Sequence, residues 1–137
     1  MLVRDIMTAK PITVDPETPM LEARQRMLEE RIRHLVVLDD ARVVGIVTDR
    51  DIRLNLPSPA TSLSVWEINY LLGRVTVGGV MTTSVIVVDP DRPVSEAARI
   101  MMDHKIGALP VVEDGHLVGI VTESDFVRAL AGSSHAA

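Results

Sequence analysis

Hydrophobic and polar positions follow the same order of patterns twice along the chain. Short runs of mostly apolar residues at 12–14 and 86–88 are each followed by Asp-Pro, a sequence typical of a strand that ends in a turn. Apolar residues then recur at helical spacing, with Pro19 and Pro93 near the first turn, where a missing N–H group costs nothing. These patterns predict a strand followed by a helix in each half of the chain.

Two further strands and a short helix follow in each half. The strands are predicted at 35–38 and 43–47, and again at 109–112 and 117–121. Tight turns join them, and Gly115 eases the second turn because glycine accepts a positive φ. The short helices are expected to begin after Thr48 and Thr122. Each half therefore has the order β-α-β-β-α.

Direct alignment of the halves indicates an internal duplication. Aligning Met7 with Met81 sets an offset of 74 residues, which holds without a gap to Asp51 and Asp125. A unit of about fifty residues is too small to bury its own apolar faces well. We therefore expect an α/β (α+β) fold in which tandem β-α-β-β-α repeats pack as a pseudo-twofold pair, with ligand clefts between them.

The repeats set the expected domain boundaries. The first repeat is placed at 1–56, an inter-repeat helical linker at 57–76, the second repeat at 77–132 and a disordered tail at 133–137. In the linker, Ser64 and Glu67 have the spacing of a capping box and predict a helix through Leu72 that Gly73 ends. This helix either packs on its own domain or forms a subunit contact through the only Trp and Tyr of the chain.

Composition narrows the classes of function. The chain has 137 residues, a formal net charge of −5 and three aromatic residues, a combination that argues against direct nucleic-acid binding. The absence of cysteine excludes disulfides, thiolate catalysis and cysteine metal sites. Because charges interrupt every long apolar run and the N-terminus lacks a signal-peptide pattern, we expect a soluble cytoplasmic protein with no membrane partner.

The sequence shows no set of residues that suggests catalysis or metal binding. The four histidines are scattered, without helical pairing. Gly78-Gly79 is not followed by the Lys and Ser or Thr of a phosphate-binding loop, and no serine elbow is present. We predict no catalytic residue, no metal site and no required cofactor.

The informative motif is G-I-V-T-x-x-D, which ends at Asp51 in the first copy and at Asp125 in the second. As a local structure it is a variant of a helix capping box, in which the threonine hydroxyl accepts from first-turn N–H groups. As a site it offers a carboxylate whose two oxygens suit the two ribose hydroxyls of a nucleotide. Its duplication at equivalent strand–helix junctions favours the second interpretation.

Several motifs together resemble a known family. The opening D-I-M-T (5–8), the segment R-H-L-V-V (33–37), its counterpart G-A-L-P-V (107–111) and both G-I-V-T-x-x-D runs are similar to a CBS (cystathionine-beta-synthase) domain pair, or Bateman module. The segment between the repeats also resembles small bacterial CBS proteins of the acetoin-utilisation type. The resemblance covers nearly the whole chain.

The resemblance implies a ligand and its binding residues. CBS pairs bind adenine nucleotides or related adenosyl compounds, so AMP, ADP, ATP or another adenosyl compound is expected, together with a homodimer. The resemblance implies that Asp51 and Asp125 hold ribose, with Thr48 and Thr122 beside them. The positions expected to flank adenine are Ile12, Thr13, Ile46, Val47, Ile86, Val87, Ile120 and Val121.

The two clefts are expected to be unequal. In the family, residues before the L-P-V-like strand reach phosphate in the cleft whose Asp belongs to the other repeat, and here these are Arg33 and His34 in one copy but Gly107 and Ala108 in the other. The stronger site is therefore expected to combine Thr122, Ser124 and Asp125 with Arg33 and His34. The Thr48/Asp51 cleft is expected to be weaker, with partial compensation by Arg50. Val36 replaces the proline found at 110, which puts the local backbone of the first copy in question.

These observations predict a non-enzymatic regulatory module that binds an adenosyl ligand between its repeats. It would signal through its conformation, its dimer or an unidentified protein partner. The alternative is a ligand-free dimerisation or interaction scaffold in which both T-x-x-D motifs act only as helix caps.

Overall fold

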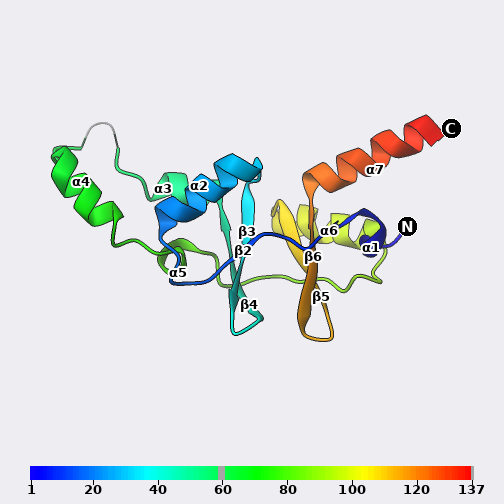
Figure 1. Cartoon of the computed structure of the whole chain (residues 1–137). Coiled ribbons are helices and arrows are strands. Elements are labelled where there is room, and N and C mark those ends of the chain that lie inside the picture. The colour runs from blue at the N-terminus through cyan, green and yellow to red at the C-terminus, as the bar shows by residue number, and fades with distance from the viewer. Residues whose placement is uncertain (59–60, 137) are drawn as a thin grey trace. The chain divides into compact units, whose positions relative to one another are not determined.

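The computed structural model describes residues 1–58 and 61–136 of the chain. The chain folds into two compact units, which we name by their motif aspartates (Figure 1). The Asp51 unit comprises Ile12–Val85, and the Asp125 unit comprises Met1–Pro11 together with Ile86–Ala137.

The Asp51 unit holds one three-stranded sheet and its helices. Its elements are β2 (Thr13–Val14), α2 (Met20–Glu30), β3 (His34–Asp39), β4 (Arg42–Thr48), α3 (Asp49–Leu54), α4 (Val65–Leu72) and α5 (Val77–Val80). The strand order is β2-β3-β4, with β2 parallel to β3 and β3 antiparallel to β4. The predicted strand–helix–hairpin–helix order is confirmed in this unit, and the helix predicted from Ser64 to Leu72 is α4.

The Asp125 unit has its own three-stranded sheet. Its elements are α1 (Val3–Ile6), β1 (Thr8–Ala9), α6 (Val94–His104), β5 (Ala108–Glu113), β6 (His116–Thr122) and α7 (Glu123–Ala136). The strand order is β1-β6-β5, and all pairs are antiparallel. The strand predicted at 86–88 is reduced to an isolated parallel bridge between Val88 and Val111.

The two hairpins make the same turn with different residues. Asp40 and Ala41 have φ values of 50° and 65°, and Asp114 and Gly115 have 52° and 79°. Positive φ at both central residues is the geometry of a type I′ turn, whose twist matches that of the flanking strands. Gly115 meets this requirement without steric cost, whereas Ala41 adopts a conformation that L-residues disfavour.

Each unit has its own core, and that core is completed by the segment that opens the other sequence repeat. Val77, in α5, is fully buried in the core of the Asp51 unit, beside Met20, Leu35 and Ile52. Its counterpart Val3, in α1, is fully buried in the core of the Asp125 unit. The segments that open the two repeats are thus exchanged between the units, so the compact units differ from the sequence repeats.

Polar contacts fix the N-terminal segment to the Asp125 unit. The Arg4 guanidinium contacts Asp91 at 2.7 Å and Glu113 at 3.0 Å. The hydrogen bonds that Arg4 donates, first to Asp91 and then to Glu113, raise the pKa of its guanidinium above the usual value. Because Asp91 and Glu113 both belong to the second repeat, these contacts hold α1 on that repeat.

The pairing of the strands tests the local expectation for Val36. Val36 pairs with Ile46 as Pro110 pairs with Ile120, so the missing proline leaves the register of the first copy unchanged. Helix α7 is assigned through Ala136, and the disordered tail expected at 133–137 stays a prediction. Residue 137 lies outside the described residues.

Candidate ligand sites at two strand–helix junctions

The Asp51 motif lies where β4 passes into α3. The Thr48 side chain accepts a hydrogen bond from the Asp51 backbone N–H at 3.1 Å, and Asp51 Oδ2 accepts from the Thr48 N–H at 2.9 Å. The predicted capping box is therefore confirmed in this copy. Asp51 Oδ1 accepts no hydrogen bond from the described residues and is only partly buried. One carboxylate oxygen thus remains available to an additional donor.

The Asp125 motif, between β6 and α7, is engaged on both carboxylate oxygens. Oδ2 accepts from the Thr122 N–H at 2.8 Å and from the Thr122 hydroxyl at 3.3 Å. Oδ1 accepts from the Thr8 hydroxyl at 3.0 Å and from the Arg128 guanidinium. Asp125 is 2% exposed. Because a carboxylate offers about four acceptor positions, these donors occupy all of them.

Thr8 and Arg128 were not among the residues predicted for the site. Arg128 lies three residues after Asp125, the spacing at which helical side chains meet, so the helix prediction itself contained that signal. Thr8 carried no comparable signal, because it is separated from Asp125 by 117 residues. The 74-residue offset maps these two partners onto Thr82 and Leu54, and a leucine cannot donate to Asp51.

Arg33 and His34 lie beside the Asp51 motif of their own unit. The Arg33 carbonyl accepts from the Asp49 N–H at 3.0 Å, and His34 pairs with Thr48 across the β3–β4 ladder. In the other unit, Gly107 and Ala108 hold the equivalent positions next to Glu123 and Thr122. The sequence assigned Arg33 and His34 to the ligand of Asp125, and that assignment stays a prediction.

An arginine-lined pocket of 480 Å³ opens next to this junction, between α2 and α3. Its apolar side is formed by Met27, Leu28, Ile32 and Ile52, and its polar lining by Arg24, Arg31, Arg33, Asp49 and Arg53. Arg53 contacts Asp49 at 3.7 Å, whereas the other three arginines form no ion pair with the described residues. Guanidinium groups in this number suit a phosphate or a carboxylate.

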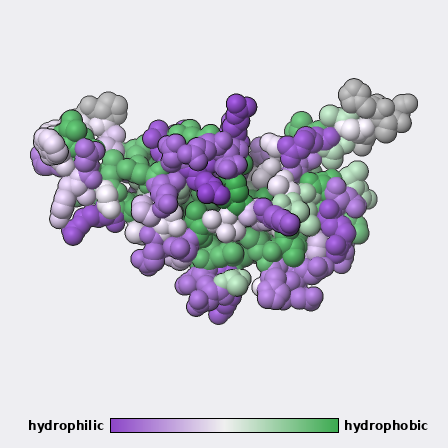
Figure 2. All heavy atoms as spheres, viewed as in Figure 1, coloured by the Kyte–Doolittle hydropathy of each residue, from purple (hydrophilic) through white to green (hydrophobic). Residues whose placement is uncertain are grey.

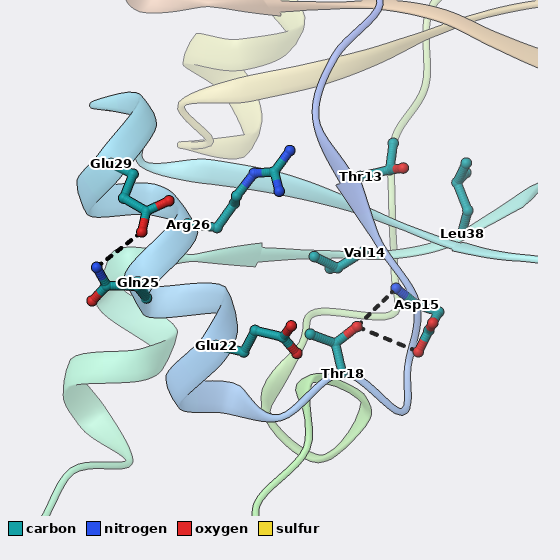
Figure 3. Close-up of a pocket in the computed structure, with 9 residues that line it drawn as sticks. All are labelled: Thr13, Val14, Asp15, Thr18, Glu22, Gln25, Arg26, Glu29 and Leu38. Atoms are coloured by element: carbon teal, nitrogen blue, oxygen red, sulfur yellow. Dashed lines mark hydrogen bonds between the residues drawn. The ribbon is translucent and has the colours of Figure 1, made fainter.

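A pocket of 560 Å³ in the same unit has the opposite charge. It lies between α2 and the end of β2, and it contains the predicted adenine-flanking residue Thr13 (Figure 3). Asp15, Glu22 and Glu29 contribute carboxylates and Arg26 the single guanidinium. Figure 2 shows the outer side of α2 as largely hydrophilic. Repulsion from three carboxylates makes this pocket a poor place for phosphate.

The predicted adenine-flanking residues differ in what they can contact. Val47 and Val121 are fully buried within the cores of their units, and Ile120 is 8% exposed. Ile12, Ile46 and Ile86 are partly buried, and Thr13 and Val87 are exposed. Any contact of Val47 or Val121 with a ligand would therefore use the backbone and not the side chain. Of the predicted polar residues, Arg50 and Ser124 are exposed.

The described part of the chain contains neither a metal-binding cluster nor a membrane-spanning helix. Within residues 1–58 and 61–136, no three His, Asp or Glu side chains gather in a group that can hold a metal ion. Among the same residues, no helix combines the length and the apolar character needed to cross a bilayer.

Comparison with known proteins decides the family. The CBS domain pattern matches residues 3–58 and 77–132, that is, both copies of the repeat. The chain belongs to the CBS domain family. CBS pairs are generally regulatory, non-catalytic modules, and the resemblance inferred from the sequence is confirmed.

Solved structures of CBS pairs share the fold over almost their full length. A putative acetoin utilization protein (AcuB) from Vibrio cholerae is 33% identical, with a TM-score of 0.81 over 98% of this chain and 93% of that chain. CBSX2, solved in complex with AMP, is 35% identical, with a TM-score of 0.79 and 96% and 97% coverage. The CBS pair of MJ0100, in complex with 5′-methylthioadenosine and S-adenosyl-L-methionine, is 31% identical, with a TM-score of 0.79 and 97% and 98% coverage. The α/β CBS-pair fold of this chain is thereby confirmed.

Proposed function

We infer that this CBS pair is a non-enzymatic regulatory module that binds an adenine nucleotide or a related adenosyl ligand at its T-x-x-D junctions. The observation that carries this proposal is the placement of an aspartate carboxylate at the same strand–helix junction in both units. Two solved relatives above 30% identity, CBSX2 and the MJ0100 pair, hold adenosyl compounds. In the proposal, Asp51 and Asp125 accept from ribose hydroxyls, and Thr48 and Thr122 lie next to the sugar.

The phosphate of the ligand would be held by arginine. Arg33 lies beside the Thr48–Asp51 motif and lines a pocket with three further arginines, so four guanidinium groups face one pocket next to this junction. The sequence-based proposal assigns Arg33 and His34 to the ligand of Asp125, with Ser124 beside it. A double-mutant cycle of Arg33 and Asp125 tests this assignment, because the effects of two substitutions on affinity are non-additive when both residues contact the same ligand.

Signalling requires that the ligand bind two conformations with different affinity. We propose that the protein itself, a homodimer of it or a protein partner responds to that difference. The ligand that best raises the stability of the fold is the first candidate for the physiological one, because binding to the native state alone stabilises it by mass action.

The experiment is a ligand panel on protein that has been unfolded, stripped of small molecules and refolded. AMP, ADP, ATP, S-adenosylmethionine and NAD are each added, and the melting temperature is recorded. A ligand present at about 100 times its Kd adds ~2.7 kcal/mol of stability, so at least one compound is expected to raise the melting temperature by several degrees. Calorimetric titration then compares Asp125→Asn, Asp51→Asn and the exposed control Asp103→Asn.

The proposal expects a loss of affinity in both Asp125→Asn and Asp51→Asn and none in Asp103→Asn. The ranking drawn from the sequence puts the larger loss at Asp125, whereas the available Oδ1 of Asp51 and the arginines beside it favour the larger loss at Asp51. A panel that leaves the melting temperature unchanged would contradict nucleotide binding. It would favour the interaction scaffold, which is also consistent with the complete capping box of the Asp51 motif and with the occupation of both Asp125 oxygens by donors from its own unit.

A further inference from the structure

The arginine-lined pocket between α2 and α3 is not part of the proposed ribose site. Helix α3 contributes Asp49, Ile52 and Arg53 to its lining, whereas Asp51 does not line it. Asp51 is two residues away from both Asp49 and Arg53, a rotation of about 200° along a helix, and so lies on the other side of α3. Arg33 lines the pocket and also adjoins the motif. The pocket is therefore a neighbour of the motif with a separate set of side chains.

Helix α2 divides its side chains between two pockets of opposite charge. The face that lines the arginine pocket has the spacing i, i+3, i+4 and i+7 and consists of Arg24, Met27, Leu28 and Arg31. The face that lines the acidic pocket (Figure 3) consists of Glu22, Gln25, Arg26 and Glu29. Arg24 and Arg31 are about 10 Å apart along the helix axis, with two apolar side chains between them. A helix surface that is only solvated needs no such segregation of charge.

The second repeat shows that the fold does not require these arginines. At the offset of 74 residues, the counterparts of Arg24, Arg33 and Arg53 are Ala98, Gly107 and Val127. Arg31 alone has a basic counterpart, Lys105, and both residues end their helices in the left-handed conformation, where a cation suits the helix dipole. Arg31 thus has a structural reason in both copies. The other three arginines are particular to the first copy.

The pocket concentrates positive charge in a protein that is acidic as a whole. Its four guanidinium groups share the pocket with one carboxylate, that of Asp49, whereas the formal net charge of the chain is −5. Arg24, Arg31 and Arg33 form no ion pair with the described residues. Because the chain as a whole repels anions, an anion that binds here must be held by the arginines of the pocket.

Shape and charge together indicate a small polyanion as the ligand. The volume of 480 Å³ lies within the range of about 300–1,000 Å³ that is typical of small-molecule sites. Met27 and Ile52 are 4% and 1% exposed and give the pocket an apolar wall. Guanidinium groups bind phosphate and carboxylate oxygens in pairs. A single phosphate cannot reach arginines about 10 Å apart, whereas an ion with several charged groups can.

We propose that this pocket is a second ligand site, which binds a small polyanion with two or more phosphate or carboxylate groups. Arg24 on α2 and Arg53 on α3 hold charged groups from the two helices, together with Arg33. The proposal goes beyond nucleotide binding at the T-x-x-D junctions, because it requires neither ribose nor adenine.

The experiment uses the full chain, unfolded, stripped of small molecules and refolded, with inorganic tripolyphosphate as the probe. Calorimetric titration is carried out in about 0.1 M salt, where exposed charges more than about 10 Å apart are screened. Saturable binding of one equivalent per chain is expected, because the second repeat lacks three of the arginines. Orthophosphate is expected to bind more weakly, and a parallel titration with citrate shows whether carboxylates are preferred to phosphates.

The absence of saturable binding by both tripolyphosphate and citrate overturns the proposal, as does binding of two equivalents per chain. Neither probe contains ribose or adenine, so these results are separate from those of the adenosyl panel. A protein that binds AMP but neither polyanion contradicts the second site alone. A protein that binds tripolyphosphate but no adenosyl compound contradicts nucleotide binding alone.

Substitutions identify the residues that hold the probe. Arg24→Gln and Arg53→Gln are each expected to raise the Kd of tripolyphosphate about threefold, and the double variant about tenfold, because both side chains are exposed. Arg26→Gln removes the same charge from the acidic face of α2, two residues from Arg24, and is expected to leave the Kd nearly unchanged. Equal losses in Arg24→Gln and Arg26→Gln, or an unchanged Kd in the double variant, overturn the proposal. Circular dichroism and the melting temperature establish that the variants are folded.

Discussion

The two copies of the motif differ in how many acceptor positions of their aspartate carboxylate are occupied. In the Asp51 unit the motif caps α3, and one oxygen of Asp51 accepts no hydrogen bond from the described residues. In the Asp125 unit all acceptor positions of the carboxylate are taken, because Thr8 and Arg128 supply donors. The counterparts of these donors are Thr82, which makes backbone hydrogen bonds with Ile46, and Leu54, which has no donor.

This difference shows that a duplicated motif does not imply duplicated chemistry. A ribose that approaches Asp51 finds a free acceptor and a nearby cluster of arginines. A ribose that approaches Asp125 must displace donors that are already in place. The affinity of each site therefore depends on neighbours that lie outside the motif.

The largest expected effect is on stability. Asp125→Ala removes the acceptor from four donors, one of them the backbone N–H of Thr122, and is expected to lower the free energy of unfolding by about 2–4 kcal/mol. Asp51→Ala removes one side of a capping box and is expected to cost about 1 kcal/mol. Urea unfolding monitored by circular dichroism measures both. Equal losses would show that the additional donors of Asp125 contribute nothing.

The next effect concerns competition between Arg128 and the ligand. Arg128→Ala removes a donor from Asp125 and is expected to tighten AMP binding at that site about fivefold, or ~1 kcal/mol; the gain is small because the Arg128 side chain is 68% exposed. Calorimetric titration gives the affinity. Weaker binding in Arg128→Ala would instead place Arg128 on the ligand.

The reciprocal substitution adds a matched test of this competition. Leu54→Arg places an arginine at the position equivalent to Arg128, three residues after Asp51. Leu54 is 72% exposed, so the change is expected to be tolerated. It should weaken AMP binding at Asp51 by a similar factor. An Asp51 site that is indifferent to the new arginine would contradict the role assigned to Arg128.

The smallest effect is expected from the threonines of the two M-T segments. Thr8→Val removes the hydroxyl that donates to Asp125 and is expected to lower the free energy of unfolding by about 0.5–1 kcal/mol. Thr82→Val changes an exposed side chain that forms no hydrogen bond with the described residues, and it is expected to change the free energy of unfolding by less than about 0.5 kcal/mol. Urea unfolding of both variants compares them directly, and equal values would mean that the Thr8 hydrogen bond is not a source of the asymmetry.

Much of the local structure was predictable. The Ser64–Glu67 and Thr48–Asp51 boxes connect residues three positions apart, so the sequence contains both partners of each. The hairpins were predictable for the same reason, with Gly115 marking a turn that Ala41 makes without glycine. The strand predicted at 86–88 is shorter than expected. Its counterpart at 12–14 pairs through two residues, whereas only Val88 forms a bridge in the second copy.

The sequence by itself determined the duplication, the order of elements and the positions of the two aspartates, because periodicity and short-range hydrogen bonds depend on neighbours along the chain. Only the tertiary structure decided which unit receives each opening segment, with Val3 buried in one core and Val77 in the other. It also decided that Asp125 meets Thr8 across 117 residues. No local pattern encodes such a pairing, since it depends on where the chain crosses from one unit to the other.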